Sequence, residues 1–278
     1  MNKSTIKYKT PISYYGGKQQ LVNKLLPMIP PHRIYCEPFF GGGALFFAKQ
    51  PSYLEVINDI NDNLINFYIQ LQNNFDDLQR LIQATLSSES IYCWAKSVYN
   101  GTEPADQLHR AFATWIVCND SFMCTPSGSW KWDNGTDQSH HGRVYEHLRR
   151  NFCPWLQQRL ATVQISCRDA LLVIQQRDTP DTFFYLDPPY PNTDQAHYSG
   201  YTSDDLGQLL DTLRQIKGKF LLSNYDAPIL HQYATQENWQ LISISMNKCA
   251  TNKYQRATKT ECLLSNYTLQ HPHQLTLF

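Results

Sequence analysis

The residues best suited to chemistry stand in a row, Asp187-Pro188-Pro189-Tyr190. They follow the apolar segment 182–186, which is typical of a buried strand, and ligands of open α/β sheets bind at the carboxyl ends of strands. An amino group on an aromatic ring is a poor nucleophile, so a site that methylates it needs acceptors for both of its N–H groups. The Asp187 carboxylate and the Pro188 carbonyl are two such acceptors, and Tyr190 offers a face for stacking a base. The alternative is a Pro-Pro turn with an incidental acid.

A glycine-rich segment, 37–43 (Glu-Pro-Phe-Phe-Gly-Gly-Gly), is the second candidate site. It follows a predicted strand at 33–37, and its glycines allow a tight turn and a close approach of the backbone to a ligand. It lacks the G-x-G-x-x-G pattern, and no Lys-Ser/Thr pair follows it. A methionine-derived cofactor without phosphates therefore fits better than NAD or ATP. A turn without any ligand is the competing interpretation.

Two further acids follow predicted strands. Asp59 lies after the strand 53–57, where a carboxylate can bind both ribose hydroxyls of an adenosyl group. Its other interpretation is a helix N-cap, which suits Asn61 or Asp62 equally well. Asp169 follows the strand 163–167 and either caps the next helix or contacts the adenine of the cofactor.

These residues require an alternation of strands and helices to position them. Short apolar runs alternate with helical spacing on both sides of the chain's centre, which predicts an α/β fold with a mainly parallel sheet. The predicted strands are 33–37, 53–57, 163–167, 182–186, 220–223, 240–246 and 261–268, and the helical patterns are 44–49, 64–71, 169–176, 204–216 and 227–233.

The stretch 73–160 has a different character. Apolar spacing predicts helices near 78–86 and 111–117, and 121–141 is rich in Gly, Ser, Thr, Asn and Trp. A loop-rich, aromatic stretch inside an α/β pattern is typical of an inserted recognition module. The chain is thus predicted to contain a first catalytic part (1–72), a recognition domain (73–160) and a second catalytic part (161–278).

Composition restricts the class of protein. The 278 residues are 42% hydrophobic and 17% charged, with no apolar run long enough to predict a membrane span or a secretory signal. The eight cysteines form no C-x-x-C pair, so no metal site is expected. Net charge is zero, but 1–36 and 247–260 contain bases and no acid, so they are either phosphate-facing surfaces or solvated loops.

Five segments resemble, in order, the motifs of the Dam-type (D12 class) adenine-N6 DNA methyltransferases. Residues 14–18 (Tyr-Tyr-Gly-Gly-Lys) are similar to that family's W/Y-x-G-G-K, 37–43 to its E-P-F-x-G-x-G, and 58–61 to its D-I-N. Residues 187–190 match its D-P-P-Y, and 260–267 is similar to its late strand. The resemblance implies a Rossmann-like S-adenosylmethionine-dependent methyltransferase domain with an inserted, mostly helical and loop-rich target-recognition domain.

The resemblance also implies roles for residues. The catalytic residues would be Asp187, Pro188, Pro189 and Tyr190, acting on an adenine rotated out of duplex DNA. S-adenosylmethionine would be bound by Tyr14, Lys18, Phe39, Gly41, Asp59, Asp169 and Asp187. DNA contacts are expected from Asn119, Ser121, Lys131, Arg143, Arg149, Lys253 and Arg256.

The motif order leaves alternatives open. Cytosine N4 is the nearest alternative acceptor, and a DNA-binding relative without activity is the alternative from another class. Tyr14 stands where the family often has Trp, and 119–132 does not clearly repeat the recognition hairpin of GATC readers, so the target sequence is undetermined. A cytoplasmic monomer, encoded by a bacterium or a phage, is expected, with a restriction enzyme as a candidate partner and no membrane association.

Overall fold

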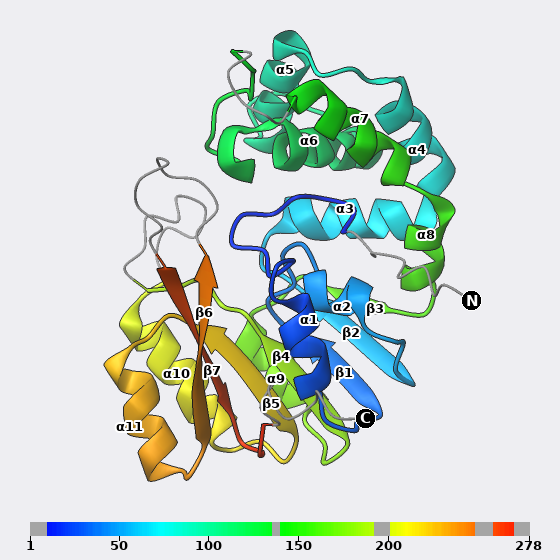
Figure 1. The fold of residues 1–278 in the computed structure, drawn as a ribbon. Helices are drawn as coiled ribbons and strands as arrows, with labels where there is room; N and C mark the ends of the chain where they lie inside the picture. Colours follow the sequence, from blue (N-terminus) through cyan, green and yellow to red (C-terminus); the bar gives the residue numbers. More distant parts are fainter. Residues whose placement is uncertain (1–9, 135–139, 192–200, 248–257, 270–278) are drawn as a thin grey trace, which may run out of the picture. The chain divides into compact units, whose positions relative to one another are not determined.

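A computed structural model describes residues 10–134, 140–191, 201–247 and 258–269 (Figure 1). These residues form a seven-stranded sheet in the order β3-β2-β1-β4-β5-β7-β6. The strands are β1 (Ile34–Glu37), β2 (Leu54–Asn58), β3 (Gln164–Ser166), β4 (Thr182–Leu186), β5 (Lys219–Asn224), β6 (Gln240–Asn247) and β7 (Thr258–Ser265). This is the Rossmann order with β7 added between β5 and β6, which confirms the predicted α/β, Rossmann-like fold class. The inserted target-recognition domain stays a prediction.

The strand directions divide the sheet into two parts. β1 pairs with β4, and β4 with β5, in parallel, as the sequence predicts. β7 runs antiparallel to both β5 and β6. The alternation pattern had indicated a mainly parallel sheet and did not reveal that the last strand inserts between two earlier ones.

The chain divides into two compact units. The first comprises 1–26, 40–51 and 57–168, and the second comprises 27–39, 52–56 and 169–278. The first unit contains β3 and α1 (Val22–Leu25), α2 (Ala44–Ala48), α3 (Asp62–Asn73), α4 (Phe75–Ala84), α5 (Glu89–Tyr99), α6 (Gln107–Asp120), α7 (His141–Asn151) and α8 (Pro154–Leu160). These two units do not coincide with the three segments predicted from the sequence. The boundaries of those segments stay predictions.

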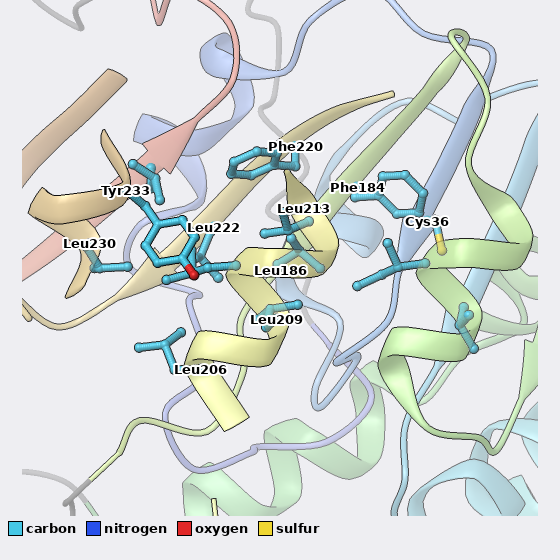
Figure 2. Close-up of a cluster of buried hydrophobic side chains, with 14 of the residues drawn as sticks. Cys36, Phe184, Leu186, Leu206, Leu209, Leu213, Phe220, Leu222, Leu230 and Tyr233 are labelled. Carbon is cyan, nitrogen blue, oxygen red and sulfur yellow. The ribbon is translucent and has the colours of Figure 1, made fainter. Parts of the chain in front are cut away.

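The second unit contains the strands from β4 to β7 together with β1, and the helices α9 (Ala170–Arg177), α10 (Ser203–Leu213) and α11 (Pro228–Gln236). All five residues of β4 are buried, as expected for a parallel strand covered on both faces. Phe184 and Leu186 of β4 pack in one cluster with Phe220 and Leu222 of β5 (Figure 2). Each such buried side chain contributes about 1.5–3 kcal/mol.

Helix α10 covers this cluster through one apolar stripe. Leu206, Leu209 and Leu213 are spaced at helical intervals and belong to the same cluster as the strand residues (Figure 2). A capping box starts the helix, because the Thr202 side chain accepts from the backbone of Asp205 and the Asp205 carboxylate accepts from Thr202. The stripe holds β4 and β5 in place, and with them the residues that follow these strands.

Helix α6 is the centre of the helical part of the first unit. It is buried without interruption from Ala111 to Asp120, and it packs against α3 and α5 (Figure 1). A helix that is apolar on nearly all sides needs such cover. At its N-terminus the Asp106 carboxylate accepts from His109 N. None of the described helices combines the length and apolar character needed to cross a membrane.

Candidate active site

The glycine-rich segment forms a left-handed turn that only glycine adopts readily. Gly41 has φ = 50° and Gly43 has φ = 65°, and a Cβ at Gly43 would lie 2.4 Å from the Phe40 ring. Phe40 N donates to Asn58 O at 2.9 Å, and the Tyr68 hydroxyl donates to Gly41 O at 3.0 Å. The turn is therefore fixed to the end of β2 and to helix α3 within the first unit.

Asp59 is the acid on which this turn depends. Its Oδ2 accepts from Gly41 N at 2.9 Å, and its Oδ1 accepts from Asn61 N at 3.0 Å. The side chain is 3% exposed. Burial raises the pKa of the Asp59 carboxyl, and the backbone donors of Asn61, Gly41 and Ile60 oppose that rise.

Asp59 is not the N-cap of helix α3. Asn61 is the N-cap of α3, and its side chain accepts from Asn63 N and Leu64 N. Asp59 instead joins the end of β2 to the glycine turn. Each carboxylate oxygen has further acceptor capacity, as ribose hydroxyls require.

Tyr14 and Lys18 lie on the same unit as Asp59. The Tyr14 ring lies against the glycine turn, since a Cβ on Gly41 would be 3.1 Å from Tyr14 Cδ1 and one on Gly42 would be 3.1 Å from Tyr14 Cβ. Lys18 is buried, and its Nζ donates to Gly16 O at 3.2 Å. Four of the predicted cofactor residues, Tyr14, Lys18, Gly41 and Asp59, thus belong to one unit, and the turn joins Tyr14, Gly41 and Asp59 directly.

Asn58 is a positioning residue that sequence reasoning did not single out. It is fully buried, and its Oδ1 accepts from Ser166 Oγ at 2.8 Å and from Arg168 N at 3.0 Å. Its Nδ2 donates to Arg168 O at 2.9 Å. The side chain therefore fixes the segment after β3 to the end of β2. Its place beside Asp59 in the motif was the only signal in the sequence.

Asp169 caps helix α9. Its Oδ1 accepts from Leu171 N at 2.9 Å and Leu172 N at 3.1 Å. This supports the capping interpretation, while the second carboxylate oxygen takes part in neither of these two bonds. A cofactor contact from Asp169 stays a prediction.

In the second unit, the register of parallel strands places Phe39 and Asp187 at the same edge of the sheet. Cys36 of β1 pairs with Phe184 of β4, and each candidate residue lies three positions further along the chain, just beyond the end of its strand. Leu186 pairs with Leu222 of β5, so Asp187, the residue after β4, lies next to Ser223 of β5 in the register. Phe39 is half-buried and packs against the cluster of the second unit.

The tetrapeptide after β4 is held by side chains from other strands. The Tyr190 hydroxyl lies 3.1 Å from Asp187 Oδ1 and also hydrogen-bonds Glu261 Oε1 of β7. Ser223 Oγ donates to the same Glu261 oxygen at 2.5 Å. Burial, Asp187 and Glu261 together raise the pKa of Tyr190 well above its usual value, so it is a neutral phenol.

A second aromatic ring, that of Tyr225, packs against the motif. Tyr190 is 5% exposed, and its ring lies edge to face against Tyr225, with centroids 4.2 Å apart. Asp187 is half-buried, which places it between the interior and the surface. The sequence indicates Glu261 only as part of the segment similar to the family's late strand, and it does not identify Ser223 or Tyr225.

The predicted DNA contacts fall into two groups. Asn119 is 3% exposed, its Oδ1 accepts from Ser13 N, and its Nδ2 donates to Trp115 O. Ser121 is also buried. In contrast, Arg143 is exposed on α7 and Lys131 is half-buried in the loop before it. Arg149 is half-buried and donates to Gln83 O.

The two remaining candidates, Lys253 and Arg256, lie outside the described residues. None of the seven DNA contacts is tested by the structure. The internal bonds of Asn119 give it a packing function, so the surface interpretation is strongest for Arg143 and Lys131.

A buried pair that the sequence did not reveal supports the loop between α6 and α7. His141 Nε2 lies 2.5 Å from Asp120 Oδ1, and Ser87 Oγ donates to the same carboxylate at 3.0 Å. The loop contains Met123 and Cys124 with φ near 60°. Such backbone, rare for non-glycine residues, is found where the surroundings hold it in place.

The strand order, the acid after β2 and the Asp-Pro-Pro-Tyr segment after β4 are those expected of an α/β methyltransferase. A family model described as D12 class N6 adenine-specific DNA methyltransferase matches residues 14–254. The chain belongs to this family. The family predicted from the motifs is thereby confirmed, and the cytosine-N4 alternative is not favoured.

Curated relatives agree with this assignment. The chain is 27% identical to "Type II methyltransferase M1.LlaDCHI" of Lactococcus lactis subsp. cremoris, over 96% of this chain and 98% of that protein. It is 25% identical to a "DNA adenine methylase" of Vibrio cholerae, over 94% and 96% of the two chains. A "DNA N-6-adenine-methyltransferase" of Escherichia phage P1 is 29% identical over 78% of this chain and 30% of its own length.

The fold also shows a weak similarity to a solved structure. It is a "SAM Dependent Methyltransferase from Agrobacterium tumefaciens", with a TM-score of 0.40, 12% identity, and coverage of 89% of this chain and 59% of that chain. A likeness of this size supports no conclusion about function. The fold class rests on the strand order, and the family rests on the sequence match.

Proposed function

We propose that this chain methylates adenine N6 in duplex DNA with S-adenosylmethionine as the donor, and that Asp187 is the acceptor that activates the amino group. The observation that carries the proposal is the environment of Asp187. It follows the buried strand β4 directly, it is half-buried, and its neighbour Tyr190 is fixed by Glu261.

The residues around the glycine turn fit the cofactor. The Asp59 carboxylate is buried and held by two backbone donors, so it is in place before any ligand binds. The turn offers backbone without Cβ atoms at Gly41 and Gly43. When bound, S-adenosylmethionine supplies an electrophilic methyl group. Tyr14, Lys18, Gly41 and Asp59 would bind it, with Phe39, Asp169 and Asp187 as further contacts.

Asp187 and Pro188 act on the other reactant. Hydrogen bonds from the two N6 hydrogens to the Asp187 carboxylate and the Pro188 carbonyl draw the N6 lone pair out of the ring. Positioned acceptors of this kind act mainly by electrostatics and need no covalent bond to the enzyme. After transfer N6 carries an excess proton, and the Asp187 carboxylate is the nearest proposed base for it.

Tyr190 and Tyr225 are the proposed aromatic surface for the base. Extruding an adenine costs a few kcal/mol, and stacking on an aromatic ring returns about 1–3 kcal/mol. Because the ring of Tyr225 lies against Tyr190, a base that reaches Tyr190 has to join or displace it. Arg143 and Lys131 are the proposed phosphate contacts.

The cellular context is proposed from two of the relatives, one a bacterial and one a phage protein. The chain is proposed to act in the cytoplasm as a monomer, with a restriction endonuclease as a candidate partner. Light scattering of the purified protein tests the monomer, since a mass twice that of the chain would reject it. Fractionation of the host cell tests the cytoplasmic location, and retrieval of an endonuclease by the tagged protein tests the partner.

The reaction is tested by transfer of labelled methyl groups to unmethylated duplex DNA, followed by nucleoside analysis. Label in N6-methyladenine is expected, with a loss of about 100-fold or more in Asp187→Ala. Asp181→Ala is the matched control, because Asp181 is an exposed acid just before β4, at the opposite end of that strand. Label in N4-methylcytosine, or equal loss in both variants, would reject the proposal.

A further inference from the structure

The phenol of Tyr190 has one proton and two carboxylate neighbours. Its oxygen lies 3.1 Å from Asp187 Oδ1 and also contacts Glu261 Oε1. A phenol can donate to only one of them at a time. The choice matters, because a hydrogen bond donated to Asp187 Oδ1 uses one of its acceptor sites and weakens the carboxylate that the proposed reaction needs as an acceptor.

The burial of the two acids favours Glu261 as the acceptor of this proton. Glu261 is 1% exposed, whereas Asp187 is half-buried. A carboxylate removed from water is strongly destabilised without donors, and a half-buried one keeps access to solvent or substrate. Glu261 Oε1 already accepts from Ser223 Oγ, which marks it as the acceptor end of the cluster.

We propose that Glu261 is a positioning residue that directs the Tyr190 proton away from Asp187. Asp187 Oδ1 can then accept a hydrogen bond from adenine N6. The inference rests on the proposed role of Asp187. It adds an element from β7, far from the tetrapeptide in sequence, whose function is to select the direction of one hydroxyl.

Replacement of Glu261 by glutamine tests this direction. The neutral amide is a weaker acceptor, so the phenol turns to Asp187, and the single-turnover rate of methyl transfer falls roughly tenfold. In a Tyr190→Phe background there is no proton to redirect. The same Glu261→Gln change should then alter the rate by less than about twofold relative to Tyr190→Phe alone.

Two further variants make the test specific. Asp211→Asn weakens another tyrosine–carboxylate bond, the one from the Tyr233 hydroxyl at 2.6 Å, and it should change the rate by less than about twofold. Glu261→Asp keeps the charge but withdraws the oxygens. It replaces Glu261→Gln in the cycle if thermal unfolding shows that the glutamine variant is poorly folded.

The outcomes separate this inference from the proposed function. A loss on Glu261→Gln that is equal in both backgrounds means a general structural effect and overturns the inference, as does no loss in either. If the wild-type protein transfers no methyl group to adenine, the proposed function itself fails. A loss confined to the tyrosine background supports the inference.

Discussion

Asp59 and Asp187 both follow a buried strand, but they are fixed in different ways. Asp59 is held by backbone N–H groups of Gly41 and Asn61, whereas Asp187 belongs to a cluster of side chains that includes Tyr190 and Glu261. Backbone donors cannot rotate, so the first acid has one orientation. The second acid is fixed by groups that can change partners.

This difference fits the two proposed tasks. The cofactor presents the same ribose in every catalytic cycle, so a rigid acceptor can bind it. Rigidity lowers the entropic cost of ordering the acceptor on binding. A base that enters and leaves requires acceptors whose hydrogen bonds can be exchanged. The comparison predicts that changes around Asp59 alter binding, and that changes around Asp187 alter rate.

The largest expected effect on binding is that of Asp59→Asn. The amide has one oxygen for two backbone donors and no charge, so the affinity for S-adenosylmethionine should fall about 100-fold. Calorimetric titration measures it. Asp62→Asn is the control, because Asp62 is an exposed acid paired with Arg110 and should leave the affinity within about twofold. Equal losses in both variants would remove the special role of Asp59.

A smaller effect is expected from Gly43→Ala, which tests the rigidity of the turn itself. The left-handed φ and the approach of the new Cβ to the Phe40 ring should lower the free energy of unfolding by about 2 kcal/mol. Gly101→Ala has a similar φ of 74° with open space around it, so its cost should be about 1 kcal/mol. Urea denaturation compares the two, and identical costs would show that the turn is not tightly packed.

The smallest effect is expected from Arg143→Ala, which lies outside both acid sites. Loss of one phosphate contact should weaken DNA binding about threefold at moderate salt and reduce the salt slope by about one. Cofactor affinity should not change. Lys217→Ala, an exposed base in the second unit, is the control. An unchanged salt slope in Arg143→Ala would reject the phosphate contact.

The same comparison explains how far the sequence could predict the site. Asp59, Gly41 and Asn61 lie within 21 residues, so their motifs reveal them together. Glu261 joins Tyr190 only because β7 inserts antiparallel beside β5. No local pattern encodes that insertion, and the contribution of Glu261 could not be inferred.

The strands predicted from the sequence and the helices that were not predicted also differ in how their residues are buried. The strands β1, β2 and β4 agree with the predictions to within one residue at each end, because short runs rich in β-branched and aromatic residues mark them. No apolar spacing in the sequence predicts helices α5, α7 and α8. The α7 sequence is polar, and the buried contact of its first residue, His141, with Asp120 is between residues distant in sequence. Such tertiary contacts leave no periodic signal.

The most direct test measures two quantities on two variants, Asp59→Asn and Asp187→Asn: the affinity for S-adenosylmethionine and the single-turnover rate at saturating cofactor. Asp59→Asn should lose affinity about 100-fold and keep its rate within about threefold. Asp187→Asn removes only a further contact of the cofactor, so it should lose at most about tenfold in affinity and about 100-fold or more in rate. If both variants lost both quantities to the same extent, the division of roles between the two acids would be contradicted.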